Sequence, residues 1–328
     1  MMLKYYAWVA AEKTLSLVPF GADVYHGLSL AANAGKRSRR RLGGCGTSYE
    51  LVRMARRMTP TGGTILDVGT GWHHHDSVLL YLCGANYKIH LFDVEDKARL
   101  SYLHTYFDHL LENLAELQAE IGLDPATTRE KLHYLKSLHS REAIYNACNF
   151  ELWITRETDK PFLPEGSVDF MVSNCVLTHI PPSILGPELI ALRRMLKSGG
   201  AMYMMIGHDD HWTFHDRSAN RFNYYRYSDR IYRALFETKF EYQNRMVKSE
   251  WLPVFERVGL KVSHYWGFVN DVTRSEIAAL PHIDERFAHY PLDELATVHS
   301  YFLLTIADDA ARTGLGAQRT EPVPQGSR

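Results

Sequence analysis

A glycine turn near residue 70 constrains the fold of this chain more than any other feature. The apolar run Thr64–Val68 ends in Asp67-Val68-Gly69-Thr70-Gly71, and a helical pattern begins at Asp76. A short apolar run, a tight turn and a helix predict a β-strand that leads into a helix. Glycines permit backbone angles and close approaches that a side chain would block, and a helix N-terminus supplies unpaired N–H groups. The turn is therefore expected to bind a ligand through its backbone.

The continuation of this turn distinguishes two classes of nucleotide ligand. The dinucleotide fingerprint requires a third glycine three positions after the second, and this chain has His74 there. A pyrophosphate cradle is therefore disfavoured. Asp93 closes a second apolar run, Ile89–Phe92, at the place where an acidic side chain accepts both hydroxyls of a ribose.

At this point the sequence resembles the class I S-adenosylmethionine-dependent methyltransferases. Two later segments carry the same resemblance in the expected order. Leu163–Ile180 is similar to the family's fourth strand and the turn after it, and Leu192–Gly200 is similar to the helix end and Gly-Gly turn before the fifth strand. The resemblance covers residues 64–206 and implies a Rossmann-like domain of seven strands, the last of which runs antiparallel.

The resemblance also implies S-adenosylmethionine as cofactor and identifies its binding residues. The glycine turn would face the methionine part of the donor. The end of the second strand would face the donor's ribose, and the end of the fourth strand would face its reacting methyl group. After the third strand, the position that matches the family's acidic residue on the adenine side could shift by one or two residues. The implied donor-binding residues are Asp67, Gly69, Thr70, Gly71, Asp93, Glu157 and Asn174.

Strand and helix patterns alternate from residue 64 onward, which predicts an α/β fold with a mainly parallel sheet and helices on both faces. The expected strands are Thr64–Val68, Lys88–Phe92, Glu151–Thr155, Val168–Ser173, Ala201–Ile206, Lys261–Trp266 and His299–Ile306. The expected helices of this core are Asp76–Cys83, Lys97–Ile121, Pro182–Leu196 and Lys248–Val258.

The chain is predicted to divide into three parts. Residues 1–60 form an N-terminal helical cap, residues 61–310 the methyltransferase-like domain, and residues 311–328 a disordered polar tail. Two insertions, 122–149 and 207–247, exceed what a compact core needs. The second begins where the fifth strand ends, and ligands of an open parallel sheet bind beyond the carboxyl ends of its strands. We therefore expect the second insertion to form a lid over the substrate.

A cluster of histidines and aspartates opens this second insertion. His208, Asp209, Asp210 and His211 follow the fifth strand, where an acceptor must reach the donor's methyl group. A histidine there titrates near neutral pH and can take a proton from a hydroxyl. We expect His208 or His211 to act as base, with Asp209 or Asp210 orienting it, and His179 is a weaker candidate. The alternative is that these residues only cap and hydrogen-bond the insertion.

Neither histidine-rich segment is predicted to hold a metal. The adjacent residues His73, His74 and His75 point in different directions, and they lack the spacing of a helical metal site. His211 and His215 do have that spacing. Because the neighbouring aspartates could bind a divalent cation, the metal alternative stays open at this second cluster.

Composition and charge narrow the range of partners. Lys+Arg 37 balances Asp+Glu 38, a net charge of -1, so no global field favours nucleic acid or an anionic membrane. The four cysteines are scattered without a Cys-x-x-Cys pair, which disfavours zinc and a disulfide scaffold and fits a reducing cytoplasm. No apolar run approaches the roughly 18 to 20 residues of a membrane span.

Two features near the N-terminus leave alternatives open. Leu3–Leu17 predicts an amphipathic helix that either packs on the domain as a cap or makes peripheral contact with a membrane surface. The basic run 36–41 is either a solvated loop or a phosphate contact. A homodimer is compatible with the sequence.

These observations predict a cytoplasmic enzyme that transfers a methyl group from S-adenosylmethionine to a small or medium-sized polar molecule, with oxygen as the favoured atom. The aromatic and arginine-rich segment 212–236 suits an anionic or glycosyl acceptor, and equally a packed helical insertion. Two other functions stay open. One is a nicotinamide-dependent oxidoreductase, against which the absent third glycine argues. The other is a regulatory protein that binds the donor without turnover.

Overall fold

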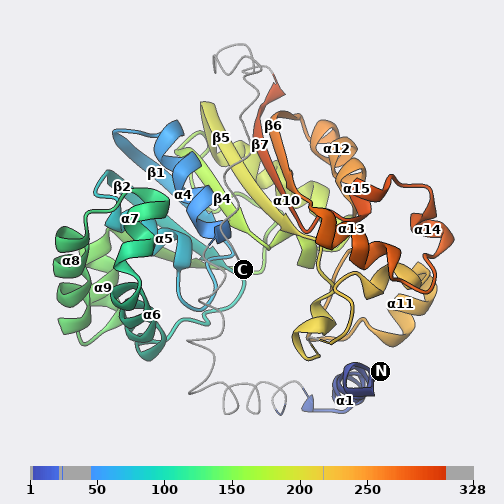
Figure 1. The fold of residues 1–328 in the computed structure, drawn as a ribbon. Helices are drawn as coiled ribbons and strands as arrows, with labels where there is room; N and C mark the ends of the chain where they lie inside the picture. Colours follow the sequence, from blue (N-terminus) through green and yellow to red (C-terminus); the bar gives the residue numbers. More distant parts are fainter. Residues whose placement is uncertain (1–2, 22–23, 25–45, 217, 308–328) are drawn as a thin grey trace.

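A single seven-stranded sheet organises the protein (Figure 1). The computed structural model describes residues 3–21, 24, 46–216 and 218–307. Within them the strand order is β3-β2-β1-β4-β5-β7-β6. The basic run 36–41 and the tail 311–328, for which the sequence made predictions, lie outside the described residues.

All seven strands expected from the sequence are present, with ends that differ by at most five residues. Strands β1 to β5 pair in parallel, and β7 is antiparallel to both β5 and β6. This confirms the mainly parallel α/β sheet and the antiparallel last strand. The strands are β1 (Gly62–Val68), β2 (Asn86–Asp93), β3 (Phe150–Ile154), β4 (Val168–Asn174), β5 (Leu196–Gly207), β6 (Leu260–Phe268) and β7 (His299–Ile306).

Helices cover both faces of this sheet because successive side chains of each strand point to opposite faces. In β1, Ile65 packs into the core shared with helices α4 to α9, and Leu66 packs into the core shared with α10 and α12. The helices of these two layers are α4 (Gly46–Met58), α5 (His75–Leu82), α6 (Leu100–Glu112), α7 (Leu114–Ile121), α8 (Pro125–Ser137), α9 (Arg141–Cys148), α10 (Pro182–Met195) and α12 (Lys248–Arg257).

The prediction of one helix over Lys97–Ile121 is wrong, because the segment forms two helices, α6 and α7. The break lies at Asn113, whose φ of -120° and ψ of 29° are not helical. Its side-chain Nδ2 donates to the carbonyl of His109 at 2.7 Å. Asparagine side chains compete with the helical backbone in this way, and a periodicity of apolar residues does not reveal it.

The two insertions are both folded. Residues 122–149 contain α8 and α9 beside α6 and α7, while residues 207–247 contain two 3-10 helices, η3 (His211–Phe214) and η4 (Asn223–Arg226), followed by α11 (Asp229–Leu235). The aromatic residues of the second insertion are mostly internal. A third apolar core contains Trp212, Phe222, Tyr224, Tyr225, Tyr232 and Phe236.

The N-terminal helix α1 (Leu3–Leu17) packs against this second insertion (Figure 1). The hydroxyl of Tyr5 donates to Asp210 Oδ2 at 2.7 Å, and its backbone N–H donates to Asp216 at 3.2 Å. Further along the helix, Lys13 donates to the carbonyl of Glu237 at 2.6 Å. These contacts join the beginning of the described chain to the lid predicted from the sequence. No described helix is long and apolar enough to cross a membrane.

Three short helices complete the described chain between β6 and β7. They add Ile277, Phe287 and Leu295 to the third apolar core, so the second insertion is enclosed from this side as well. The helices are α13 (Asp271–Ala278), α14 (Glu285–Ala288) and α15 (Leu292–Leu295).

Candidate active site

The carboxyl ends of four strands meet at one edge of the sheet. Val68 of β1 is in register with Phe92 of β2 and with Ser173 of β4, and Ser173 is in register with Met204 of β5. The glycine turn, Asp93, Asn174 and the segment after Gly207 therefore all begin at this edge. In open α/β sheets such an edge is where ligands bind.

The glycine turn wraps around the end of β2. The N–H groups of Gly69 and Thr70 both donate to the carbonyl of Phe92, at 2.8 and 3.0 Å. Gly69 has a φ of 76°, and a Cβ atom there would lie 2.2 Å from Cγ2 of Val176, in the turn after β4. Only glycine combines this left-handed backbone with so close an approach. The position thus brings the turns after β1 and β4 into contact.

Asp93 holds the second half of the glycine turn. Its Oδ2 accepts the N–H of Gly71 at 3.0 Å, and its Oδ1 accepts the N–H of Glu95 at 3.2 Å. A carboxylate oxygen has more than one acceptor site, so both oxygens keep capacity for the hydroxyls of a ligand. The side chain is therefore fixed by backbone donors beside the turn.

Asp67 braces the same turn from inside the sheet. Its Oδ2 accepts the hydroxyls of Thr70 at 3.1 Å and Ser77 at 2.6 Å. Burial raises the pKa of Asp67, and the nearby charge of Asp76 raises it further. A positive charge next to this carboxylate would favour its ionised form.

Asp76 and Ser48 belong to the site but were missed in the sequence. Asn174, at the end of β4, places its Nδ2 3.3 Å from Asp76 Oδ2 and 3.3 Å from Ser48 Oγ. Burial raises the pKa of Asp76, while hydrogen bonds from Ser48 and Asn174 oppose the rise. An acidic residue in the first helical turn after the glycines is a signal that could have identified Asp76. Ser48 lies in α4, and no local pattern singles it out.

Three buried carboxylates therefore surround one backbone turn. Asp67, Asp76 and Asp93 are only 2%, 5% and 8% exposed. Among the residues that the structure describes, the groups that shift the pKa of Asp67 or Asp76 include no lysine or arginine. Unpaired buried carboxylates are costly, so the arrangement favours a cationic ligand and disfavours an anionic diphosphate.

Glu157 lies apart from these carboxylates, in the loop after β3. Its side chain is exposed and pairs with Lys160 at 3.1 Å. The loop does start at the same sheet edge, because Ile154 of β3 is in register with Asp93. The structure brings the other six predicted donor-binding residues together at the turns after β1, β2 and β4, and it leaves Glu157 at the periphery.

After β5, two of the predicted catalytic residues are held inside the protein. The ring nitrogens of His208 lie 3.1 Å from the carbonyl of Met246 and 2.9 Å from Ser300 Oγ, and burial lowers the pKa of His208 to about 4. Asp210 accepts the hydroxyl of Tyr5 and the N–H of Trp212, and burial raises its pKa to about 7. His208 connects the second insertion to β7, and Asp210 connects it to α1.

His211 is placed differently, because it forms a pair with Glu241. Its Nδ1 lies 2.8 Å from Glu241 Oε1. Although burial would raise the pKa of Glu241, the hydrogen bond and charge of His211 hold that pKa below its ordinary value. The ring of His211 is stacked on that of Phe214 and tilted against that of His179, with centroids 5.5 and 4.8 Å away. Glu241, rather than Asp209 or Asp210, is therefore the carboxylate that orients His211.

His179 joins this pair to form a group with metal-ligand side chains. The ligand atoms of His179, His211 and Glu241 all lie within 4.8 Å of one another. Ligands at about 2.1 Å from a tetrahedral zinc ion lie roughly 3.4 Å apart, so the group is wider than such a site. Nδ1 of His211 is also engaged with Glu241, so we interpret the group as a hydrogen-bonded histidine–carboxylate pair with the ring of His179 tilted against that of His211.

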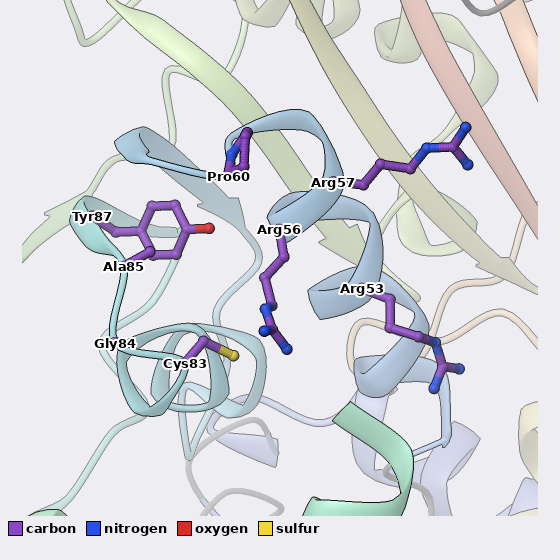
Figure 2. A pocket seen from close by; sticks show the side chains of 8 residues that line it. All are labelled: Arg53, Arg56, Arg57, Pro60, Cys83, Gly84, Ala85 and Tyr87. Carbon is purple, nitrogen blue, oxygen red and sulfur yellow. The ribbon is translucent and has the colours of Figure 1, made fainter. Parts of the chain in front are cut away.

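Two hollows in the described surface lie away from these residues. The larger, of about 520 Å³, is lined by Arg53, Arg56, Arg57, Pro60, Cys83, Gly84, Ala85 and Tyr87, near the start of β1 and β2. Figure 2 shows that Arg56 extends toward Cys83, whereas Arg53 and Arg57 point away. The second hollow, of about 390 Å³, lies between α11, α12 and the segment 242–246. Neither lining includes the glycine turn or His211.

No family model and no curated protein matches the chain. Solved structures do match. A geranyl diphosphate methyltransferase in complex with SAM has a TM-score of 0.43 and 10% identity, with 80% of this chain and 85% of that chain covered. A 1,6-didemethyltoxoflavin-N1-methyltransferase from Burkholderia thailandensis, with S-adenosylhomocysteine bound, has a TM-score of 0.44 and 9% identity over 88% and 90% of the two chains. A TehB-like SAM-dependent methyltransferase from Corynebacterium glutamicum has a TM-score of 0.39 and 15% identity over 87% and 96%. At these TM-scores the similarity is distant.

Proposed function

We propose that this protein is an S-adenosylmethionine-dependent methyltransferase. The observation that carries the proposal is the glycine turn surrounded by the buried carboxylates of Asp67, Asp76 and Asp93. S-adenosylmethionine brings a sulfonium and an ammonium group, both positively charged, and its ribose offers two hydroxyls. The cations would be attracted by the carboxylates, whereas the diphosphate of a nicotinamide cofactor would be repelled by them.

The donor would lie across the carboxyl edge of the sheet. The backbone of Gly69, Thr70 and Gly71 would face its methionine part, and Asp93 would take the ribose hydroxyls. Asn174, which is fixed to Asp76, would lie near the reacting methyl group. The adenine-side role of Glu157 has the least support, because its side chain is exposed and paired with Lys160.

The methylated atom is proposed to be an oxygen of a small or medium-sized polar molecule. As the new bond forms between the acceptor oxygen and the methyl carbon, the bond from carbon to sulfur breaks, and its electron pair stays on sulfur. The hydroxyl proton passes to Nε2 of His211, while Nδ1 donates to Glu241 and keeps the ring oriented. The products are the methyl ether or ester and S-adenosylhomocysteine.

His208 and Asp210, the other two catalytic residues predicted from the sequence, have weaker support in this role. Both ring nitrogens of His208 are hydrogen-bonded within the protein, and Asp210 is fully buried against Tyr5. Their geometry favours the structural alternative, in which they connect the lid to β7 and α1. The aromatic residues of segment 212–236 likewise fill an apolar core, which weakens the proposal of a glycosyl acceptor.

The donor assignment is tested by calorimetry with S-adenosylmethionine, S-adenosylhomocysteine and NADH. We expect the two sulfur compounds to bind, NADH not to bind, and Asp93→Ala to weaken S-adenosylhomocysteine about 100-fold through the loss of charged hydrogen bonds. Asp159→Ala, an exposed aspartate after β3, is the matched control. Unchanged affinity in Asp93→Ala would overturn the ribose assignment, and selective binding of NADH would favour the oxidoreductase.

Three further parts of the proposal concern the protein's surroundings. A cytoplasmic location, a homodimer and a peripheral membrane contact through α1 are each compatible with the chain. Cell fractionation, light scattering and sedimentation with anionic vesicles would test them in turn.

A further inference from the structure

The residue that replaces the third glycine of the dinucleotide pattern has an unusual conformation. His74 precedes α5 with a φ of 52° and a ψ of 45°, in the left-handed region, and it is only 1% exposed. A side chain in this region costs free energy relative to glycine, and the surrounding structure must hold it there. The contacts of the imidazole ring identify what holds it.

Both ring nitrogens of His74 are hydrogen-bonded. Nδ1 lies 2.7 Å from Thr70 Oγ1, and Nε2 lies 2.9 Å from the hydroxyl of Tyr145. Burial lowers the pKa of His74 to about 3, so the ring is neutral at physiological pH and carries a single N–H group. One nitrogen therefore donates a hydrogen bond and the other accepts one.

The partners of Thr70 show which nitrogen is the donor. The hydroxyl of Thr70 donates to Asp67 Oδ2, and its backbone N–H donates to Phe92. The Thr70 hydroxyl has a single hydrogen, which it gives to Asp67, so it accepts a hydrogen bond from Nδ1 of His74. Nδ1 therefore carries the hydrogen of the ring, and Nε2 accepts from Tyr145.

The result is a directed chain of hydrogen bonds that enters the glycine turn. The hydroxyl of Tyr145 donates to His74, His74 donates to Thr70, and Thr70 donates to Asp67. Tyr145 belongs to α9, which lies within the insertion 122–149. The chain therefore connects this insertion to the residue that braces the turn.

The same helix reaches the second donor loop by a different contact. Arg141 of α9 forms a bidentate pair with Asp96, at 2.6 and 2.9 Å, and donates to the carbonyl of Ala98. Asp96 follows Asp93 in the loop after β2. Helix α9 thus holds both loops that border the proposed donor site, one through Arg141 and one through His74.

We infer that His74 is a positioning residue, which transmits the support of the first insertion to the glycine turn and keeps the turn in its donor-binding shape. The inference rests on the proposed function for its affinity readout. The inference gives a structural role to the insertion 122–149 and to His74, which stands in place of the third glycine of the dinucleotide pattern. His74 acts through Thr70 and Asp67, without touching the donor itself.

A double-mutant cycle tests this coupling with S-adenosylhomocysteine as the probe. Tyr145→Phe removes only the donor hydroxyl, and His74→Asn keeps a residue that tolerates the left-handed region but is too short to reach Tyr145. We expect each variant to bind about 5- to 10-fold more weakly, and the double variant to bind no more weakly than His74→Asn. Tyr134→Phe, on the exposed surface of α8, is the control and should bind as the parent does.

Amide hydrogen exchange of residues 69–75 provides a readout that does not depend on the ligand. We expect exchange there to rise several-fold in Tyr145→Phe and to stay unchanged in Tyr134→Phe. Unchanged exchange in Tyr145→Phe, or affinity losses that simply multiply in the double variant, would overturn the inference. If the parent protein binds no S-adenosylhomocysteine, the proposed function fails, while the exchange experiment still decides the role of His74.

Discussion

The two halves of the proposed site use similar buried residues in different ways. In the donor half, His74 and Asp67 are hydrogen-bonded within the protein and hold a backbone turn in place. In the acceptor half, His208 and Asp210 are buried and hydrogen-bonded in the same manner, but they connect the second insertion to β7 and α1. His211 alone of the predicted catalytic residues has its ring paired with a carboxylate, that of Glu241, and it lies tilted against the half-exposed ring of His179. Hydrogen-bond partners, rather than burial, thus distinguish His208 and Asp210 from His211, the residue that we propose to meet a substrate.

The largest effect is expected in the donor half, where the backbone itself is the binding group. Gly69→Ala would place a Cβ atom 2.2 Å from Val176 and strain a φ of 76°. We expect more than 100-fold loss of S-adenosylhomocysteine affinity by calorimetry, with about 2 kcal/mol lost from the free energy of unfolding.

The matched control for this substitution is Gly166→Ala. Gly166 has a similar φ of 61°, and no atom lies within 4 Å of an added Cβ. It should lose stability through backbone strain alone and keep its affinity. If Gly69→Ala binds within threefold of the parent, the turn is not the donor site.

An effect of about 100-fold is expected in the acceptor half, on turnover alone. His211→Ala and Glu241→Gln remove the proposed base and its orienting carboxylate, while S-adenosylhomocysteine affinity should stay within twofold of the parent. The measurement is the transfer of label from methyl-labelled S-adenosylmethionine into a small-molecule extract. Full methyl-transfer activity in His211→Ala would exclude His211 as the base.

Treatment of the parent protein with a chelator is the control for this labelling experiment. A hydrogen-bonded pair needs no cation, so treatment with a strong chelator should leave the labelling rate of the parent protein unchanged. Loss of the label after chelation, with recovery on adding a divalent cation, would instead favour His179, His211 and Glu241 as metal ligands.

The smallest effect on function is expected for His208, whose contribution is to stability. Burial lowers the pKa of His208 from 6.5 to about 4, so as pH falls through this window the unfolded chain takes up a proton before the folded protein does. The stability associated with neutral His208 is present above pH 6.5 and is lost as pH falls towards 4, by up to about 3 kcal/mol.

A comparison with His208→Asn isolates this contribution, because the other buried groups titrate in both proteins. Denaturant unfolding between pH 7.5 and pH 4.5 should show the advantage of the parent protein shrinking as the pH falls. An advantage that is constant with pH would mean that His208 is charged or exposed in the folded protein.

Local patterns predicted most of the fold and much of the donor half. Apolar runs mark the strands, and glycines mark the turn, because these signals depend only on neighbouring residues. Asp67 and Asp93 could be predicted as donor-binding residues for the same reason, since each stands at or next to the end of a strand. The helix break at Asn113 could not be predicted in this way, because a side chain that donates to a backbone carbonyl one turn earlier leaves the apolar periodicity intact.

The acceptor half was harder to predict because its contacts join residues distant in the chain. Glu241 meets His211 from the far end of the second insertion, and no spacing rule connects them. The residues His208 and His211 are three positions apart, yet one faces Ser300 and the other Glu241. The residue types show that segment 208–211 is polar, but only tertiary packing decides which of its side chains is turned inward.

The hydrogen bond between Tyr5 and Asp210 has a consequence for how the protein is made. Tyr5 precedes its partner in the chain, so Asp210 leaves the ribosome only after β1 to β5 have been synthesised. Until then the apolar residues Tyr5 and Val9 lack the second insertion, against which they pack in the folded protein. Helix α1 can therefore dock only after most of the sheet has been synthesised.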